Sequence, residues 1–356
     1  MGVINFVQQT FGVLAGGAVA LAGVSFALLI AFQEKLIYVP HLPGTETRGY
    51  ELDQPEAFGF RRVDEDYENL WLESGDGTKL HAWLLKHPNR DASIVLFLQE
   101  NAGNIAHRLG FARRLLVDAG VHVMLLSYRG YGESEGSPSE KGMVLDARAA
   151  LSYLESRSDL GPQIFVFGRS IGGAVAIATV AELADEKRVE SISGVILENT
   201  FTCMADMISK LMPFLAVLVS RGKPLHFLLR SPWNSDTRIE RGLGGVPVLF
   251  ITGERDEMVP PEHMYKLHSL LPNAAINPGR SSDEASCTAE DGDVGTKSSR
   301  GEAVLRSSSS TSTSSSMQSR KQFVSIKDGR HMDTWIIGRD NYWRPLRTFI
   351  ATNSRR

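Results

Sequence analysis

Residues 164–176 read IFVFGRSIGGAVA, an apolar run followed by Gly168-Arg169-Ser170-Ile171-Gly172 and then by small residues. A short apolar run of this kind is typical of a strand buried on both faces of a parallel sheet. The G-x-S-x-G pattern after it predicts a sharp turn from strand to helix, with glycines beside Ser170 because side chains would collide there. The bare pattern is weak, but this context predicts a nucleophilic serine. The alternative is a glycine-rich turn with an idle serine.

Apolar runs and helix-length segments alternate on both sides of this turn. Strands that alternate with helices predict a doubly wound α/β domain, here over about residues 60–350. Ligands of such sheets bind at the carboxyl ends of the strands, so we expect the chemistry in the loops there. The predicted strands are 69–73, 80–86, 94–98, 121–127, 164–167, 194–197, 248–252 and 323–326, and the longest predicted helices are 107–119, 141–156 and 172–183.

An activated serine needs a histidine base and a carboxylate that orients this base. Where the serine sits in a strand–helix elbow, the acid and then the histidine follow it along the chain. The seventh predicted strand ends in a turn that begins at Gly253 and contains three carboxylates. We select Asp256 as the acid, with Glu254 and Glu257 as flanking alternatives. A solvated acidic turn is the structural alternative.

The base can be selected by elimination among the nine histidines. Six of them precede the acidic turn, and His263 and His268 lie on the predicted helix directly after it. Only His331 follows the last predicted strand, where a C-terminal helix is expected to begin. The sequence therefore predicts His331 as the general base.

An oxyanion formed at the serine needs two N–H donors, one from the residue after the nucleophile and one from the loop after the third strand. These requirements select the backbone N–H groups of Ile171 and Asn101. The alternative for the second loop, QENAGN (99–104), is an ordinary Asn/Gly turn.

Composition excludes several other classes of protein. The 356 residues are 42% hydrophobic and 22% charged, as expected for globular domains. A net charge of −3 argues against a nucleic-acid-binding protein. The two cysteines, Cys203 and Cys287, have no spacing typical of a zinc site or a disulfide scaffold. We expect no metal and no organic cofactor, and a dinucleotide fingerprint is absent.

The N-terminus predicts a membrane anchor within residues 1–36. Residues 11–32 form a run of 22 residues without a charge, long enough to span a hydrocarbon core about 30 Å thick. A cleaved signal peptide is the main alternative, but the run is long for one and no basic region precedes it. A buried core helix is the other alternative.

Two segments extend a minimal α/β domain. We define residues 201–245, between the sixth and seventh predicted strands, as the cap segment; its run LMPFLAVLV (211–219) predicts either an apolar lid over an acyl-chain site or a helix covering the core. Residues 273–321 contain ten consecutive Ser/Thr residues at 307–316, which predicts a disordered insertion. It is interpreted as a linker, with phosphorylation of its serines as the alternative.

Taken together, seven blocks of the sequence resemble the bud-emergence-46-like alpha/beta hydrolases, most closely the plant members; the family includes alpha/beta hydrolase domain-containing protein 13. The resemblance extends from the anchor to Trp343. It implies an alpha/beta hydrolase fold, with a mostly parallel eight-stranded sheet flanked by helices, and a charge relay on Ser170, Asp256 and His331. Many hydrolases have His-Gly where this chain has Gln99-Glu100, so the chain departs from the pattern at the second oxyanion donor. The blocks are QENAGNIAHR (99–108), SYRGYGESEG (127–136), FGRSIGGAVA (167–176), ILENTFT (196–202), RSPW (230–233), DEMVPP (256–261) and HMDTW (331–335).

These observations predict a membrane-anchored, single-pass serine hydrolase in the endoplasmic reticulum or plasma membrane. Its expected substrate is a lipid-like ester or an S-acylated protein, cleaved through an acyl-enzyme. The alternative is a catalytically inactive membrane scaffold in cell polarity or growth signalling. No sequence feature supplies a peptide subsite for a protease, and none indicates an oligomeric state.

Overall fold

An eight-stranded sheet forms the centre of the computed structural model, which describes residues 2–41, 54–211, 213–272 and 320–354. The strand order is β1-β2-β4-β3-β5-β6-β7-β8, and the two pairings at its start, β1 with β2 and β2 with β4, are antiparallel. All the pairings from β4 to β8 are parallel. The strands are β1 (Tyr67–Glu73), β2 (Lys79–Leu85), β3 (Ile94–Leu98), β4 (His122–Leu126), β5 (Ile164–Arg169), β6 (Ile192–Glu198), β7 (Val248–Gly253) and β8 (Lys321–Ile326).

Each of the eight predicted strands is present, with ends shifted by at most two residues. Strands β3, β4, β5 and β7 are buried along their whole length, which explains why their sequences are apolar without alternation. The predicted insertion 273–321 lies outside the described residues except for its last two.

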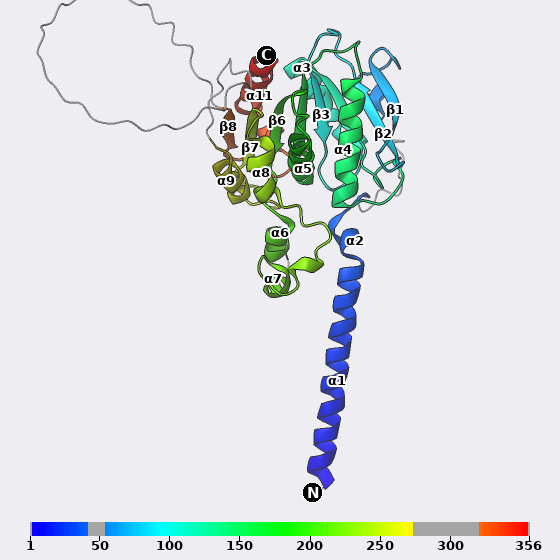
Figure 1. The fold of residues 1–356 in the computed structure, drawn as a ribbon, viewed down its shortest axis with the longest axis vertical. Helices are drawn as coiled ribbons and strands as arrows, with labels where there is room; N and C mark the ends of the chain where they lie inside the picture. Colours follow the sequence, from blue (N-terminus) through cyan, green and yellow to red (C-terminus); the bar gives the residue numbers. More distant parts are fainter. Residues whose placement is uncertain (1, 42–53, 212, 273–319, 355–356) are drawn as a thin grey trace, which may run out of the picture. The chain divides into compact units, whose positions relative to one another are not determined.

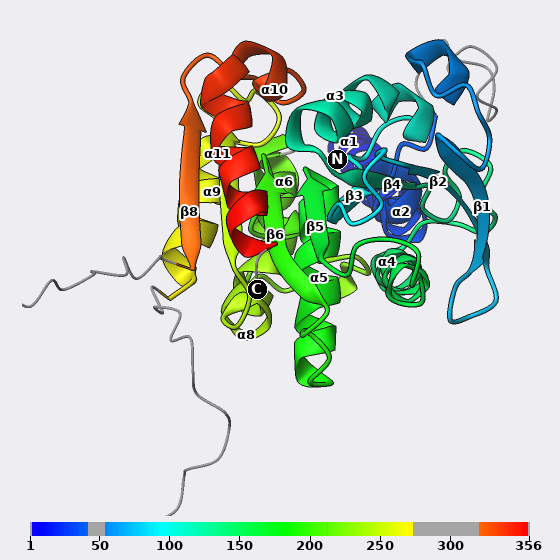
Figure 2. The ribbon, with the colours of Figure 1, turned by 90° about the horizontal axis from the view of Figure 1, so that it is seen from above.

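Helices cover both faces of the sheet (Figure 2). On one face, α3 (Leu109–Ala119) and α11 (Arg339–Asn353) pack on the sheet. On the other face lie α4 (Glu140–Glu155), α5 (Ile171–Asp185), α8 (Ser235–Leu243) and α9 (Pro261–Leu270). Short helices η1 (Pro55–Phe58), η2 (Ile105–Arg108) and α10 (Thr334–Ile337) lie in the connections.

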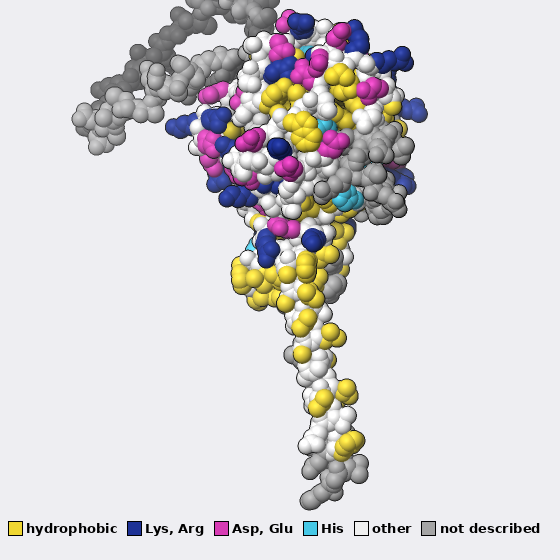
Figure 3. Space-filling model, turned by 90° about the vertical axis from the view of Figure 1, so that its right-hand side faces the viewer, with side chains coloured by type: hydrophobic (Ala, Val, Ile, Leu, Met, Phe, Trp, Pro, Cys, Tyr) yellow, Lys and Arg dark blue, Asp and Glu magenta, His cyan; other side chains and the backbone are white. Residues whose placement is uncertain are grey.

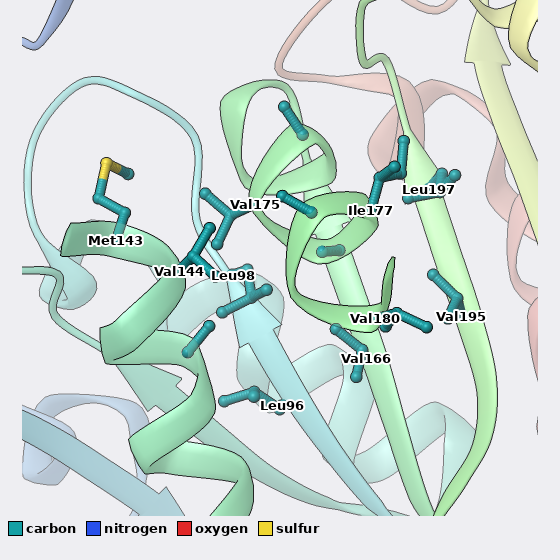
Figure 4. Packing of buried hydrophobic residues seen from close by; sticks show 14 of the residues in the cluster. Leu96, Leu98, Met143, Val144, Val166, Val175, Ile177, Val180, Val195 and Leu197 are labelled. Atoms are coloured by element: carbon teal, nitrogen blue, oxygen red, sulfur yellow. The ribbon is translucent and has the colours of Figure 1, made fainter. Parts of the chain in front are cut away.

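Helix α5 is the most deeply buried of these helices and fixes the turn that precedes it. Figure 4 shows Val175 and Val180 directed toward apolar side chains of the central strands, among them Leu98 and Val166. These side chains are fully buried. Burial of each such side chain contributes about 1.5–3 kcal/mol to stability, so the position of α5 against β3 and β5 is strongly determined.

The N-terminal helix α1 (Gly2–Ala31) is followed by the short helix α2 (Gln33–Ile37). Residues Gln9–Ala31 are long and apolar enough to cross a membrane, and none of the most apolar window is buried, which argues against a core helix. The cap segment forms α6 (Met204–Leu211), α7 (Pro213–Val219) and η3 (His226–Leu228) before α8. Figure 1 shows α6 and α7 beyond the same end of the sheet as α1 and α2.

Candidate active site

Ser170 occupies a tight turn between β5 and α5. Its backbone has φ 56° and ψ −123°, a conformation that costs energy in a residue with a side chain and is typical of a nucleophile elbow. Two hydrogen bonds hold the turn: the Ser170 N–H donates to the Glu198 carbonyl (2.9 Å), and the Thr200 hydroxyl donates to the Ser170 carbonyl (2.7 Å). The elbow is therefore fixed by the end of β6.

Two glycines make this turn sterically possible. A Cβ atom on Gly168 would lie 2.3 Å from the carbonyl oxygen of Gly172, and one on Gly172 would lie 2.0 Å from that of Leu98. Both distances are far shorter than the closest contact that a Cβ atom can make with a backbone atom. The glycines of the G-x-S-x-G pattern thus permit the close approach of α5 to β3 and β5.

Asp256 and His331 are in direct contact. Asp256 Oδ2 lies 2.7 Å from His331 Nδ1, and Oδ1 accepts the backbone N–H groups of Met258 (2.9 Å) and Val259 (2.8 Å). Both Asp256 and His331 are buried. The carboxylate is held by backbone donors on one oxygen and orients the imidazole with the other, which leaves Nε2 as the ring nitrogen for proton transfer.

The two alternative acids lie elsewhere. Glu254 accepts hydrogen bonds from the hydroxyls of Tyr265 and Ser325, at the exposed side of the turn. Glu257 lines the cavity beside the serine. Among the three carboxylates, the hydrogen bond to His331 is made by Asp256.

Sequence reasoning missed Asn199, which holds the histidine loop in place. Its Nδ2 donates to the carbonyl of His331 (3.1 Å) and to the Thr334 hydroxyl (2.9 Å), and its Oδ1 accepts the Gly253 N–H (2.8 Å). The residue has a positive φ of 48°, which asparagine tolerates better than most residues. The sequence does contain a signal for this residue, because the polar pair Asn199-Thr200 follows at the end of a predicted apolar strand.

Ser170 and His331 are thus positioned by consecutive residues, since Thr200 binds the serine backbone and Asn199 binds the histidine backbone. The described residues include no hydrogen bond between the Ser170 hydroxyl and the His331 ring. Catalytic hydrogen bonds are commonly long without substrate and shorten in the complex.

The two expected oxyanion donors lie at the same cavity as the serine. Ser170, Ile171 and Asn101 all line a cavity of about 380 Å³. Ile171 is the first residue of α5, so its N–H has no acceptor within the helix. The shared cavity supports the prediction that these two N–H groups act as a pair.

The side chain of Asn101 is fastened to the segment that follows α2. Its Nδ2 donates to the Ile37 carbonyl (2.5 Å), and its Oδ1 accepts the Val39 N–H (3.2 Å) and the Tyr131 hydroxyl (2.8 Å). The Asn101 loop is therefore held by residues adjoining the N-terminal helix. This link between distant parts of the chain has no signal in the sequence.

Behind the elbow lies a buried ionic cluster. Arg169 pairs with Glu198 (3.0 Å), which also accepts the Tyr342 hydroxyl (2.8 Å), and Arg108 pairs with Glu100 (2.9 Å). Burial alone would raise the pKa of Glu100, but the charges of Arg108 and Arg169 outweigh burial and hold this pKa below its ordinary value. Burial raises the pKa of Glu198. Glu100, which departs from the usual His-Gly, is thus a member of this cluster.

The strand order, the antiparallel start of the sheet and the strand–elbow–helix unit define the chain as an alpha/beta hydrolase. A profile of the serine aminopeptidase S33 family matches residues 93–238. The Pyrococcus furiosus esterase Pf2001 superposes with a TM-score of 0.58 at 17% identity, covering 89% of this chain and 97% of the esterase. At this identity the likeness shows the fold alone.

Relatives along most of the sequence show the family. The chain is 40% identical to the alpha/beta hydrolase domain-containing protein WAV2 of Arabidopsis thaliana, over 94% of this chain and 92% of WAV2. It is 37% identical to protein bem46 of Schizosaccharomyces pombe and 37% identical to a Saccharomyces cerevisiae protein named an uncharacterized membrane protein; each match covers 73% of this chain, with 81% of bem46 and 84% of the other. The chain belongs to the alpha/beta hydrolase family that contains WAV2 and bem46.

Proposed function

We infer that the chain is a membrane-anchored serine hydrolase that cleaves an acyl ester or thioester through an acyl-enzyme. The observation that carries this proposal is the buried Asp256–His331 hydrogen bond of 2.7 Å, whose carboxylate is held by Met258 and Val259 of the same apolar cavity that Ser170 lines. Serine, carboxylate and histidine follow one another in the chain order of this fold.

In the first half of the reaction, the Ser170 hydroxyl attacks the substrate carbonyl carbon while His331 Nε2 takes its proton. Asp256 stabilises the resulting imidazolium and keeps the ring oriented. The oxyanion is bound by the N–H groups of Ile171 and Asn101. Because both donors belong to the folded backbone, they stabilise the oxyanion without a rearrangement of the protein.

The first half ends when His331 gives its proton to the leaving alcohol or thiol, as the bond from carbonyl carbon to oxygen or sulfur breaks and the acyl-enzyme remains. Water then attacks the acyl-enzyme while His331 takes one of its protons. The tetrahedral intermediate collapses, Ser170 regains the proton, and a carboxylic acid leaves.

The membrane part of the proposal rests on α1. Its 23-residue span, Gln9–Ala31, meets the length and composition of a single-pass helix, and the yeast relative is named a membrane protein. We place the enzyme in the endoplasmic reticulum or plasma membrane, where its substrate is a small lipid-like ester or an S-acylated protein.

The test is labelling of membranes with a fluorophosphonate probe, which reacts only with an activated serine. We expect labelling of the wild-type protein and its loss in Ser170→Ala and in His331→Ala. Ser269→Ala is the matched control, because Ser269 is an exposed serine on α9 whose hydroxyl donates to the Lys266 carbonyl. Its labelling should equal that of the wild type.

A folded wild-type protein that is not labelled would contradict the proposal and favour the inactive scaffold. Labelling that survives in Ser170→Ala would also contradict it, because another residue would then carry the reaction.

A further inference from the structure

The cavity at Ser170 has one wall made by the N-terminal helix. Besides the serine end, its lining comes from the cap segment and from the last turns of α1 with α2. Three residues of α1 take part: Phe26, Leu29 and Ile30. With Gln33 of α2 they follow the spacing i, i+3, i+4, i+7 of a single helix face.

Among the α1 side chains that the structure describes, those on this face are the covered ones. Phe26, Leu29 and Ile30 are half-buried, whereas Val24 and Leu28 are more than half exposed. The membrane helix therefore presents one face to the cavity and the rest of its surface outward. On the opposite wall lie Met204, Met207 and Ile208 of α6. Methionine side chains are flexible and adapt to apolar ligands of varying shape.

Hydrogen bonds hold the α1–α2 wall of the cavity on both of its sides. Gln33 is buried; its Nε2 donates to the Leu228 carbonyl (3.0 Å) and its Oε1 accepts the Arg230 N–H (2.8 Å), both after η3 begins. On the other side, Ile37 and Val39 bind the side chain of Asn101. Each such hydrogen bond contributes about 0.5–1.5 kcal/mol, so α2 holds a defined position between the cap segment and the expected oxyanion loop.

Large apolar side chains remain exposed around the same region. Leu211, which lines the cavity, is 65% exposed, and Val217 and Phe227 of the cap segment are 69% and 77% exposed. Figure 3 shows hydrophobic side chains gathered where the cap meets the N-terminal helix. Exposed apolar surface that adjoins a membrane span is suited to contact with lipid. The residues that line the cavity therefore adjoin an exposed apolar surface at the end of the proposed membrane span.

We propose that the inner face of α1 is one wall of an acyl-chain site, and that a single linear acyl chain enters this site directly from the bilayer, between α1 and α6. The occupant is the acyl chain of a membrane-resident ester or thioester, whose carbonyl reaches Ser170. This inference rests on the proposed serine hydrolase activity and adds the wall that the acyl chain contacts and the route by which the chain enters. The volume of about 380 Å³ suits one chain of a small-molecule substrate.

The test uses the full-length protein in phosphatidylcholine vesicles. Acyl glycerol esters and S-acyl peptides with chains from butanoyl to hexadecanoyl are supplied as separate series, so that the two series identify the source of the chain. In the wild type, kcat/KM should rise with chain length by up to about fourfold per methylene until the cavity is full.

The decisive comparison is Leu29→Trp against Leu28→Trp. Both place an indole at the same depth on α1, but Leu29 lines the cavity and Leu28 does not. We expect Leu29→Trp to lower the ratio of long-chain to butanoyl kcat/KM by at least tenfold, and Leu28→Trp to leave this ratio unchanged. Ile30→Trp is a second variant on the lining face, with the same expected result if Leu29→Trp is poorly produced.

The outcomes separate this inference from the proposed function. Hydrolysis without chain-length dependence, or an equal change in Leu28→Trp and the lining variants, would overturn the acyl-chain wall and leave the serine hydrolase intact. Absence of both fluorophosphonate labelling and butanoyl hydrolysis in the wild type would instead overturn the proposed function itself.

Discussion

Asn199 and Thr200 show how two residues outside the predicted triad hold its parts together. Thr200 binds the backbone of Ser170 and Asn199 binds the backbone of His331, directly after β6. Rates of enzyme reactions fall steeply with small displacements of the reacting groups, so residues that fix two loops have effects without touching substrate. Asn199 is in this sense a positioning residue.

We predict that Asn199→Asp slows fluorophosphonate labelling by about 10²-fold. The change keeps the oxygen that accepts the Gly253 N–H and a residue tolerant of positive φ, but it removes the donor to the His331 carbonyl. The labelling rate constant is the measurement. Asn353→Asp removes a comparable buried donor, to the Phe349 carbonyl (2.8 Å), away from the site and should label like the wild type. Equal slowing in both variants would refute the positioning role.

In the buried ionic cluster, Tyr342 contributes to stability through its hydroxyl, which donates to Glu198. Removal of this hydroxyl in Tyr342→Phe leaves Glu198 Oε2 with Arg169 alone, in a fully buried place. We expect a loss of about 1–3 kcal/mol in the free energy of unfolding, measured by urea denaturation. Tyr265→Phe is the control, because Tyr265 is 45% exposed and its hydroxyl donates to Glu254 at the exposed side of the acidic turn; it should change stability by no more than about 0.5 kcal/mol. Equal losses of unfolding free energy in the two variants would contradict the prediction that the buried hydroxyl contributes more than the exposed one.

At the scale of elements, the junction of β5 and α5 combines a buried helix with a turn that has no room for side chains. Because α5 packs against the central strands, it cannot move away to relieve a collision at its first turn. Gly172 lies at this contact with β3.

We therefore predict that Gly172→Ala destabilises the protein severely, by about 3 kcal/mol or more, or prevents folding. Gly245→Ala provides the matched control, since a Cβ there meets nothing within 4 Å and its φ is not positive. Its free energy of unfolding should stay within about 0.5 kcal/mol of the wild type. Urea denaturation compares the two, and a stable Gly172→Ala protein would show that α5 can shift.

For the whole molecule, the chain returns to the sheet after the Ser-rich insertion through β8. The Lys321 ammonium donates to the carbonyls of His268 (2.9 Å) and Leu271 (2.6 Å), so the first residue of β8 is tied to the end of α9. The acid lies before the insertion and the histidine after it, yet their geometry is set by the pairing of β7 with β8.

We predict that replacing residues 275–318 with a flexible linker of about eight residues, which spans up to ~26 Å, leaves labelling intact. The shorter loop should add about 1.5 kcal/mol to stability, because loop-closure entropy rises only with the logarithm of length. A scrambled insertion of the original length should match the wild type in both measurements. A folded linker variant that is not labelled would show that the insertion itself regulates the site.

The eight strands and the elbow could be predicted from the sequence because their signals are local. Strands buried on both faces are nearly all apolar, and the turn at Ser170 requires glycines at fixed offsets. The chain order of serine, acid and histidine then limits the base to His331 and the acid to the turn with Glu254, Asp256 and Glu257, of which Asp256 is the one that the structure places in contact with His331. The span in α1 is equally local, since it follows from length and composition.

Other features were decided only by the tertiary structure, because they join residues far apart in the chain. Nothing near Glu100, Arg108 or Tyr342 in the sequence marks them as neighbours of Arg169 or Glu198. The contact of the α2 segment with Asn101, and the closing of the cavity by α1 and α6, likewise depend on how separate elements meet. Local pattern thus determined the sheet, the elbow and the triad candidates, whereas packing decided which residues support them and which elements line the cavity at Ser170.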